Sequence, residues 1–220
     1  MKNLIVLGGS GIGMVAISIA REMGTFTIGG FLNDVIPVGE MIGKYDKFPV
    51  IGKTEDLPRF LEDENNVFFI AYVGMQHEEE VFKKIESFNI PAHRYATLIH
   101  PSASIPKGMC KIGNGVLIAP LAQLSPDTTL EDNCMMLGNS FLGHDSTLKR
   151  FAHLASNATV GSWVTIGRAC HIGTNCTVRE KVSIGDFCLV GSGSVVLKDV
   201  EPHSIVVGNP AKLLRKTEEA

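Results

Sequence analysis

The sequence lacks an excess of positive charge. Its 220 residues include 20 lysines and arginines against 23 aspartates and glutamates, which gives a formal net charge of −3. Proteins that bind nucleic acid or an anionic membrane surface ordinarily carry a basic patch or stripe. We therefore expect neither nucleic acid nor a membrane as a partner, and we expect the ligands to be small molecules.

Long apolar runs are also missing. No stretch reaches the roughly 18 uninterrupted apolar residues that are needed to cross a bilayer. The apolar N-terminus differs from a secretory signal, because the four glycines between Gly8 and Gly13 would break the helix of its apolar region. They suit a turn between a strand over residues 2–7 and a helix over residues 14–23. These features predict a cytoplasmic protein.

What the sequence has in abundance is a six-residue repeat. From Ile112 to Val196 every sixth residue is a branched aliphatic residue or methionine, through fifteen hexads without an insertion. Four residues after each of these guide positions comes a small or β-branched residue, from Val116 to Val200. A period of six fits neither a helix nor a strand bounded by hairpins. It predicts a coil of short parallel strands, three hexads per turn, with both series pointing into a narrow core.

The residue three after each guide position supports such a coil, because it marks the corners. Glycine, asparagine and aspartate adopt a positive φ most readily, as a tight corner requires. Nine of the fifteen corner positions hold one of these residues: Gly115, Asp127, Asn133, Asn139, Asp145, Asn157, Asn175, Gly193 and Asp199.

All five cysteines fall in one position of this repeat. Cys134, Cys170, Cys176 and Cys188 take the small inward position, and Cys110 takes it in the preceding, less regular turn. Because all five cysteines share this inward position, we expect them to be buried, small apolar residues of a protein in a reducing compartment. We do not expect them to form disulfides, bind zinc or act as a nucleophile.

The first hundred residues show a different pattern, in which strands alternate with helices. Such alternation predicts a small parallel sheet. The expected strands cover residues 4–7, 27–31, 67–72 and 95–99, and the expected helices cover residues 14–23 and 78–88.

A glycine-rich turn follows the first expected strand and predicts phosphate binding through backbone amides at the start of a helix. The dinucleotide pattern G-x-G-x-x-G fails, because Met14 occupies its third glycine position. With only about a hundred residues available, we expect a mononucleotide-sized domain that binds a nucleotide carrying one sugar. The expected contacts are the turn and the end of the second strand, where a ribose or base would lie: Gly9, Ser10, Gly11, Ile12, Gly13, Asn33 and Asp34.

The second half of the chain resembles hexapeptide acyltransferases, through hexads such as I-G-T-N-C-T and I-G-D-F-C-L and through V-V-G-N-P-A-K at residues 206–212. With the N-terminal domain and H-P-S-A at residues 100–103, the whole chain resembles the sugar O-/N-acetyltransferases. These include sialic acid O-acetyltransferases and N-acetyltransferases of nucleotide-linked 4-amino sugars.

This resemblance implies an α/β half-Rossmann domain that binds a nucleotide sugar over residues 1–99. It implies a left-handed parallel β-helix of hexapeptide repeats, with a C-terminal cap, over residues 100–220. It also implies acetyl-CoA as the donor, a homotrimer with active sites between subunits, and a role in surface glycan or polysaccharide biosynthesis.

The pair His144–Asp145 is the expected catalytic centre. His144 takes an outward position for which the repeat offers no structural reason, whereas Asp145 takes a corner position in which aspartate is common. Acetyl transfer requires a base, and an imidazole is suited to that role near neutral pH. In the family that the chain resembles, a histidine at this place acts as the base, and the carboxylate after it orients it. Whether Asp145 serves the corner, the histidine or both stays open.

Other outward residues of the coil are candidates for coenzyme binding. His153 matches a second histidine that meets the coenzyme near its thioester in some relatives, and Thr174 and Ser192 are expected to line the coenzyme groove. His171 follows His153 by one coil of eighteen residues and is expected to face solvent. No metal is expected, because the zinc-binding hexapeptide carbonic anhydrases need two histidines about five residues apart, which these histidines do not provide.

Two departures from the family pattern concern the sugar-nucleotide pocket. Ile12 stands where family members often have histidine, and Gly74 is followed by Met75 and Gln76 where many have Asp-Asn. They leave open the O-acetylation of a sugar of the sialic acid type. A non-catalytic scaffold or nucleotide-sugar sensor with a vestigial His144 is the alternative from another class.

Overall fold

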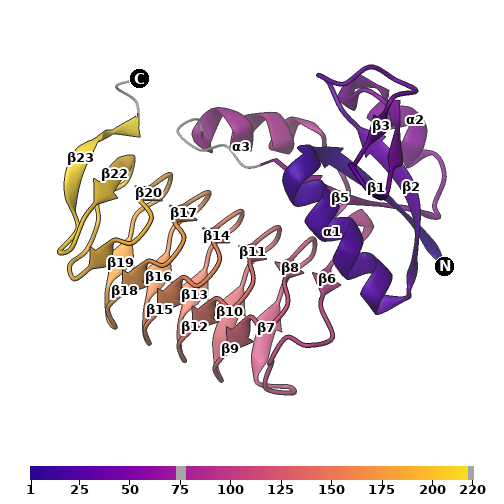
Figure 1. Cartoon of the computed structure of the whole chain (residues 1–220). Helices are drawn as coiled ribbons and strands as arrows, with labels where there is room; N and C mark the ends of the chain where they lie inside the picture. Colours follow the sequence, from indigo (N-terminus) through magenta and orange to yellow (C-terminus); the bar gives the residue numbers. More distant parts are fainter. Residues whose placement is uncertain (73–77, 218–220) are drawn as a thin grey trace.

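The computed structural model describes residues 1–72 and 78–217, which form an α/β domain seated on one side of a coil of short strands (Figure 1). The α/β domain holds a five-stranded sheet in the order β3-β4-β2-β1-β5. Strands β4, β2, β1 and β5 run parallel, and β3 adds to β4 in the antiparallel direction. The strands are β1 (Lys2–Gly8), β2 (Phe26–Leu32), β3 (Met41–Ile42), β4 (Phe48–Gly52) and β5 (Asn66–Ala71).

Helices connect these strands. They are α1 (Ser10–Met23), α2 (Leu57–Leu61) and α3 (Glu78–Ser87), with single 3₁₀ turns at η1 (Thr54–Asp56) and η2 (Ala92–Arg94). Helix α1 starts four residues earlier than expected and includes Gly11 and Gly13. A side chain at Gly13 would place a Cβ 2.5 Å from Cε1 of Phe31, so this glycine lets the helix lie close on the sheet. None of the helices in the described part of the chain is long and apolar enough to span a bilayer.

Two sequence-based expectations for this domain are wrong. The segment 95–99 is not a strand of its sheet: Tyr95 forms only an isolated bridge to Phe68, and β6 (Leu98–Ile99) pairs with β8 of the coil. The buried Arg94 turns the chain there, because its guanidinium donates to the carbonyl oxygens of Leu61, Asp63 and Asn66. Between β2 and β5, where neither a strand nor a helix was expected, the chain forms β3, β4, η1 and α2. Gly74, Met75 and Gln76 lie outside the described residues.

The coil has three faces of parallel strands, as a left-handed parallel β-helix does. The first face is β7 (Cys110–Ile112), β10 (Thr128–Leu130), β13 (Thr147–Leu148), β16 (Thr165–Ile166) and β19 (Ser183–Ile184). The second is β6, β8 (Leu117–Ile118), β11 (Met135–Met136), β14 (His153–Leu154), β17 (His171–Ile172), β20 (Leu189–Val190), β22 (Ser204–Val207) and, antiparallel, β23 (Lys212–Lys216). The third is β9 (Gln123–Leu124), β12 (Phe141–Leu142), β15 (Thr159–Val160), β18 (Thr177–Val178) and β21 (Val195–Val196).

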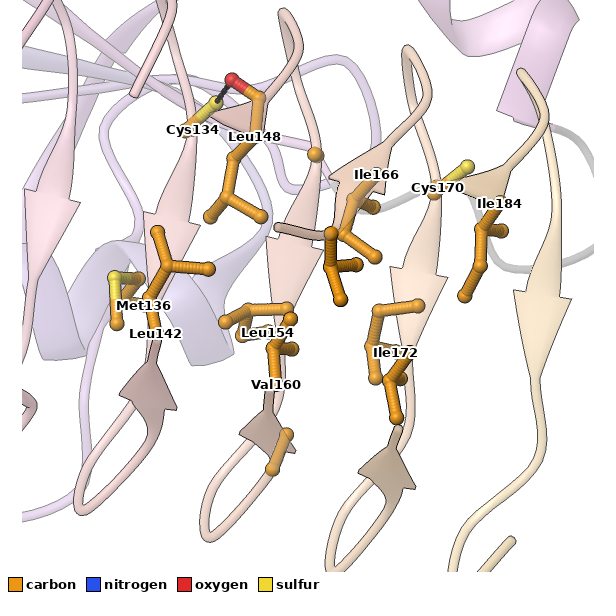
Figure 2. Close-up of a cluster of buried hydrophobic side chains, with 14 of the residues drawn as sticks. Cys134, Met136, Leu142, Leu148, Leu154, Val160, Ile166, Cys170, Ile172 and Ile184 are labelled. Atoms are coloured by element: carbon orange, nitrogen blue, oxygen red, sulfur yellow. Dashed lines mark hydrogen bonds between the residues drawn. The ribbon is translucent and has the colours of Figure 1, made fainter. Parts of the chain in front are cut away.

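Both repeat series fill the interior of the coil, as predicted. Figure 2 shows guide residues of successive turns, such as Leu142, Val160 and Ile166, pointing into the same narrow core. Four of the five cysteines are buried in the small inward position, and Cys110 is half-buried. Burial raises the pKa of the Cys134 thiol well above its ordinary value, and this thiol lies 3.1 Å from the Lys149 carbonyl oxygen. These cysteines are therefore packing residues.

Positive φ is a property of the coil rather than of the residue type at its corners. Fourteen of the fifteen corner positions have a positive φ, including six that hold neither glycine, asparagine nor aspartate: Leu121, Phe151, Trp163, Ala169, Lys181 and Phe187. Asp199 is the exception among the nine predicted corners, and its carboxylate instead accepts the backbone N–H of Ser183. A three-sided coil must turn a corner every six residues, and this requirement imposes the positive φ as long as the repeat continues.

The α/β domain covers the second face and its corner with the first face. Phe82 of α3 packs edge-on against Phe151 and Phe187, with ring centroids 5.4 and 5.8 Å apart, and Arg150 forms an ion pair with Glu86. Closer to the N-terminal end of the coil, Leu98, Leu117, Ala119 and Met135 of the second face join the hydrophobic cluster around α1. None of the three α-helices described for this domain lies on the third face (Figure 1).

Candidate functional site

His144 and Asp145 form a hydrogen-bonded pair at an exposed corner between the third and first faces. Nδ1 of His144 lies 2.8 Å from Oδ2 of Asp145, and each side chain is 44% exposed. Asp145 has φ 57°, so it forms the corner and holds the histidine at the same time. When Nδ1–H donates to the carboxylate, Nε2 keeps a lone pair, which is the form of imidazole that accepts a proton.

Trp163 completes this corner and was missed in the sequence. Its indole meets the imidazole of His144 edge-on, with ring centroids 4.5 Å apart and planes at 85°. Its backbone N–H donates to the His144 carbonyl oxygen at 3.0 Å. Lys181, one coil further on, places Nζ 5.5 Å from the indole centroid. The eighteen-residue offset from Asp145 to Trp163 to Lys181 is the signal that could have found this stack.

His153 and His171 lie elsewhere, side by side on the second face beneath the α/β domain. Their rings meet at 90° with centroids 4.8 Å apart. His153 is only 6% exposed, and neither of its ring nitrogens has a hydrogen-bond partner in the structure as described. Burial lowers the pKa of His153 to about 3 and also lowers the pKa of His171. The expectation that His171 faces solvent is wrong, because it is half-buried with Nδ1 inaccessible.

Thr174 and Ser192 lie on a third part of the coil. Both are exposed, and they stand one coil apart at the corner between the second and third faces. A single chain therefore places the expected catalytic pair, the second histidine and these two residues on different sides of its coil.

The glycine-rich turn leads into α1 with its amides exposed. Gly8 has φ 101°, Gly9 caps the helix without a side-chain hydrogen bond, and the first turn holds no acidic residue. The first N–H groups of a helix have no partner within it, so Ser10 and Gly11 present free donors to solvent. Ile12 is half-buried and packs against the cluster around α1.

The end of β2 has its polar groups already engaged. Asn33 is buried, its amide donates to the Gly8 carbonyl oxygen, and its own oxygen accepts the N–H groups of Val35 and Ile36. It therefore fixes the turn rather than facing a ligand. Asp34 accepts hydrogen bonds from Thr54 and from Lys84 of α3, each at 2.8 Å. Partial burial alone would raise the pKa of Asp34, but these bonds outweigh it and lower the pKa to about 2.

These groups surround a pocket of about 260 Å³ at the carboxyl ends of β1, β2 and β5. Its lining consists of Gly8, Gly9, Asn33, Asp34, Val35, Ala71, Tyr72 and Lys84. Lys84 was missed because its partner lies 50 residues away and no local pattern links the two. Amide donors, a lysine and a carboxylate at this edge of a parallel sheet are suited to phosphate and to a ribose or base. No cluster of three metal-ligating side chains occurs among residues 1–72 and 78–217.

Two family models match the sequence. The GMPPB C-terminal domain matches residues 94–206, just over half of the chain, and the PglD N-terminal domain matches residues 3–85. No curated protein matches the sequence significantly.

Solved structures match along almost the whole chain. A mutant of perosamine N-acetyltransferase from Caulobacter crescentus, in complex with CoA and GDP-perosamine, is 23% identical, with 98% of each chain covered and a TM-score of 0.84. The acetyltransferase domain of PglB from Neisseria gonorrhoeae is 27% identical, with 97% of this chain and 100% of that chain covered and a TM-score of 0.83. The same domain in complex with acetyl coenzyme A is 25% identical, with the same coverage and a TM-score of 0.79.

The buried histidine pair predicts a loss of stability in mild acid. In the unfolded chain His153 takes up a proton below about pH 6.5, whereas in the folded chain its pKa is about 3, so stability falls as the pH drops from 6.5 toward 3. His153→Leu, which matches Leu117 and Leu189 of the same face, should flatten this fall by up to about 1.4 kcal/mol per pH unit.

Urea unfolding between pH 7 and pH 4 measures this slope. His93→Leu, at an exposed histidine, is the control and should keep the wild-type slope. Equal slopes for wild type and His153→Leu would show that His153 does not stay neutral in the folded protein.

Proposed function

Because this chain belongs to the family of the GMPPB C-terminal domain and resembles nucleotide-amino-sugar N-acetyltransferases along almost its whole length, we propose that it moves the acetyl group of acetyl-CoA to the amino group of a nucleotide-linked sugar. The observation that carries the proposal is the His144–Asp145 pair, which is hydrogen-bonded at 2.8 Å on an exposed corner of the coil. CoA and GDP-perosamine in the Caulobacter enzyme, and acetyl coenzyme A in the PglB domain, support this choice of donor and acceptor. They favour N-transfer over O-transfer.

His144 acts as the general base in this proposal. The sugar nitrogen attacks the thioester carbonyl carbon, a C–N bond forms, and Nε2 of His144 accepts the proton that the nitrogen loses. The C–S bond then breaks, and the proton passes to the departing sulfur, which leaves as free CoA. Asp145 stabilises the imidazolium that forms between these steps. Backbone amides of a neighbouring subunit would hold the developing oxyanion.

The nucleotide binds in the pocket at the start of α1. The exposed amides of Ser10 and Gly11 follow Gly9 of the pocket and are placed for a phosphate, and Lys84 adds a positive charge to the pocket lining. Asp34 keeps its charge because of its low pKa, so it accepts hydrogen bonds from a ribose or base. Asn33 shapes the turn beside the pocket, and Gly13 lets α1 pack closely on the sheet. Ile12 belongs to the hydrophobic core that supports the turn.

The site is shared between subunits of a homotrimer. The α/β domain covers the second face and its corner with the first, while His144 stands at the corner between the third and first faces. A sugar held by one α/β domain therefore meets the His144 of a neighbouring chain. The third face, which none of the described helices covers, lies between the corner of His144 and the corner of Thr174 and Ser192. We assign Thr174, Ser192 and His153 to coenzyme binding.

We place the division between the nucleotide-sugar domain and the acetyltransferase coil at residues 1–99 and 100–220. The protein works in the cytoplasm, where five unpaired cysteines stay reduced, and it supplies acetylated sugars for surface glycan or polysaccharide assembly.

Substitution of the base separates an enzyme from a scaffold or sensor. His144→Ala should lower kcat by roughly 10²- to 10⁴-fold, because the attacking nitrogen loses its proton acceptor. Release of CoA thiol with a panel of nucleotide amino sugars measures the rate, and His93→Ala is the control at an exposed histidine. Unchanged turnover in His144→Ala would overturn the assignment, and a wild type inactive on every sugar of the panel would favour the scaffold.

The phosphate site can be tested at Gly11, where a side chain has open space within 4 Å. Gly11→Asp puts a negative charge at the start of α1, which stabilises the helix but repels a phosphate. We expect its KM for the nucleotide sugar to exceed that of the isosteric Gly11→Asn roughly tenfold, with the KM for acetyl-CoA unchanged. Equal KM values for the two variants would place the phosphates elsewhere.

Complementation tests whether the site is shared. His144→Ala and Gly11→Asp are co-expressed and assayed at a nucleotide-sugar concentration well below KM, at which Gly11→Asp alone keeps only about a tenth of the activity and His144→Ala alone keeps less. With random assembly, three quarters of the trimers contain both variants. In each mixed trimer, one of the three sites combines an intact Gly11 turn with an intact His144 of the neighbouring chain. About one quarter of wild-type activity should therefore return. No recovery in trimers shown to be mixed would mean that each chain builds its own site.

A further inference from the structure

Trp163 occupies a backbone conformation that tryptophan rarely adopts. Its φ is 55°, and bulky residues rarely occupy the left-handed region because Cβ then lies too close to the following carbonyl oxygen. Residues held in such conformations concentrate at functional sites, where the surrounding structure maintains them. The position therefore raises the question of what keeps a tryptophan there.

Packing explains the aromatic residues at other corners but not this one. Phe151 and Phe187 also have positive φ, and both are packed against Phe82 of the α/β domain. Trp163 is 52% exposed and belongs to none of the hydrophobic clusters of the described chain. Its ring contacts are the imidazole of His144 and the ammonium of Lys181.

These contacts restrict the base from two sides. Asp145 fixes Nδ1 of His144 by a hydrogen bond, which still allows the ring to rock about that bond. The indole of Trp163 meets the ring at 85° and limits this rocking. Lys181 in turn lies over the indole and holds it in place through a cation–π contact. The charged groups that face His144 and its indole neighbour are thus Asp145 and Lys181.

We propose that Trp163 is a positioning residue for the acetyl transfer: it holds the imidazole of His144 at the angle from which Nε2 receives the proton of the attacking nitrogen. This inference rests on the proposed role of His144 as the base. Since the contact does not involve a substrate, its loss lowers kcat and leaves KM for both substrates unchanged. Misplacement of a catalytic group by about 1 Å costs up to roughly 100-fold in rate.

Trp163→Asn is the main test, because asparagine adopts a positive φ easily and occupies positive-φ corners on another edge of the coil at Asn139, Asn157 and Asn175. We expect this variant to melt at or above the wild-type temperature while kcat falls about 10- to 100-fold with unchanged KM values. Trp163→Phe keeps a ring beside His144 and should recover most of the lost kcat. Leu121→Ala, another exposed apolar residue at a positive-φ corner, is the matched control and should keep wild-type kinetics.

A spectroscopic measurement tests the contact directly, because Trp163 is the only tryptophan of the chain. The imidazole of His144 covers one edge of the indole, so His144→Ala should increase the quenching of Trp163 emission by acrylamide relative to the wild type at the same pH. The inference would be overturned if Trp163→Asn kept the wild-type kcat. It would also be overturned if Trp163→Phe were as slow as Trp163→Asn. If His144→Ala keeps full activity, the assignment of His144 as the base is wrong. A normal kcat in Trp163→Asn with an inactive His144→Ala would contradict only the role of Trp163.

Discussion

The structure depends on one constraint, the closure of a three-sided coil every eighteen residues. Each corner must bend within a single residue, and fourteen of the fifteen corners do so with a positive φ whatever side chain they carry. Closure aligns residues eighteen apart in neighbouring turns, so their backbones pair in register and their side chains touch. The stack of Asp145, Trp163 and Lys181 exists because of this alignment, and it is the reason that these three residues lie with His144 at one corner.

The second organising contact is the seat of the α/β domain on the coil. Phe82 fills the corner made by Phe151, Ala169 and Phe187, and α1 covers the start of the second face. This seat has two consequences for chemistry. It buries His153 so that its imidazole stays neutral, and it leaves the corner of His144 in solvent on a side that the domain does not reach. The same seat joins the nucleotide pocket to the coil, because α3 carries both Phe82 and the Lys84 that pairs with Asp34.

The two histidine environments illustrate how burial decides chemical roles. The His144 side chain is 44% exposed, and its Nδ1 is hydrogen-bonded to the Asp145 carboxylate. His153 has no hydrogen-bond partner among the described residues and faces another imidazole, so a proton there would be opposed by both desolvation and charge repulsion. This difference in burial is the reason that we propose His144, and not His153, as the base. We expect His153 to act as a neutral hydrogen-bonding group.

Much of this architecture was determined by the sequence itself. The six-residue period fixes the inward residues of the coil, the place of the cysteines and the outward position of His144, because each is a local consequence of register. The strand, turn and helix at the N-terminus follow from local glycine and apolar patterns in the same way. Only tertiary structure decided the rest. Burial of His153 and His171, the pairing of Asp34 with Lys84, and the course of residues 95–99 depend on which surface of the coil the α/β domain covers, and contacts between distant segments set that choice.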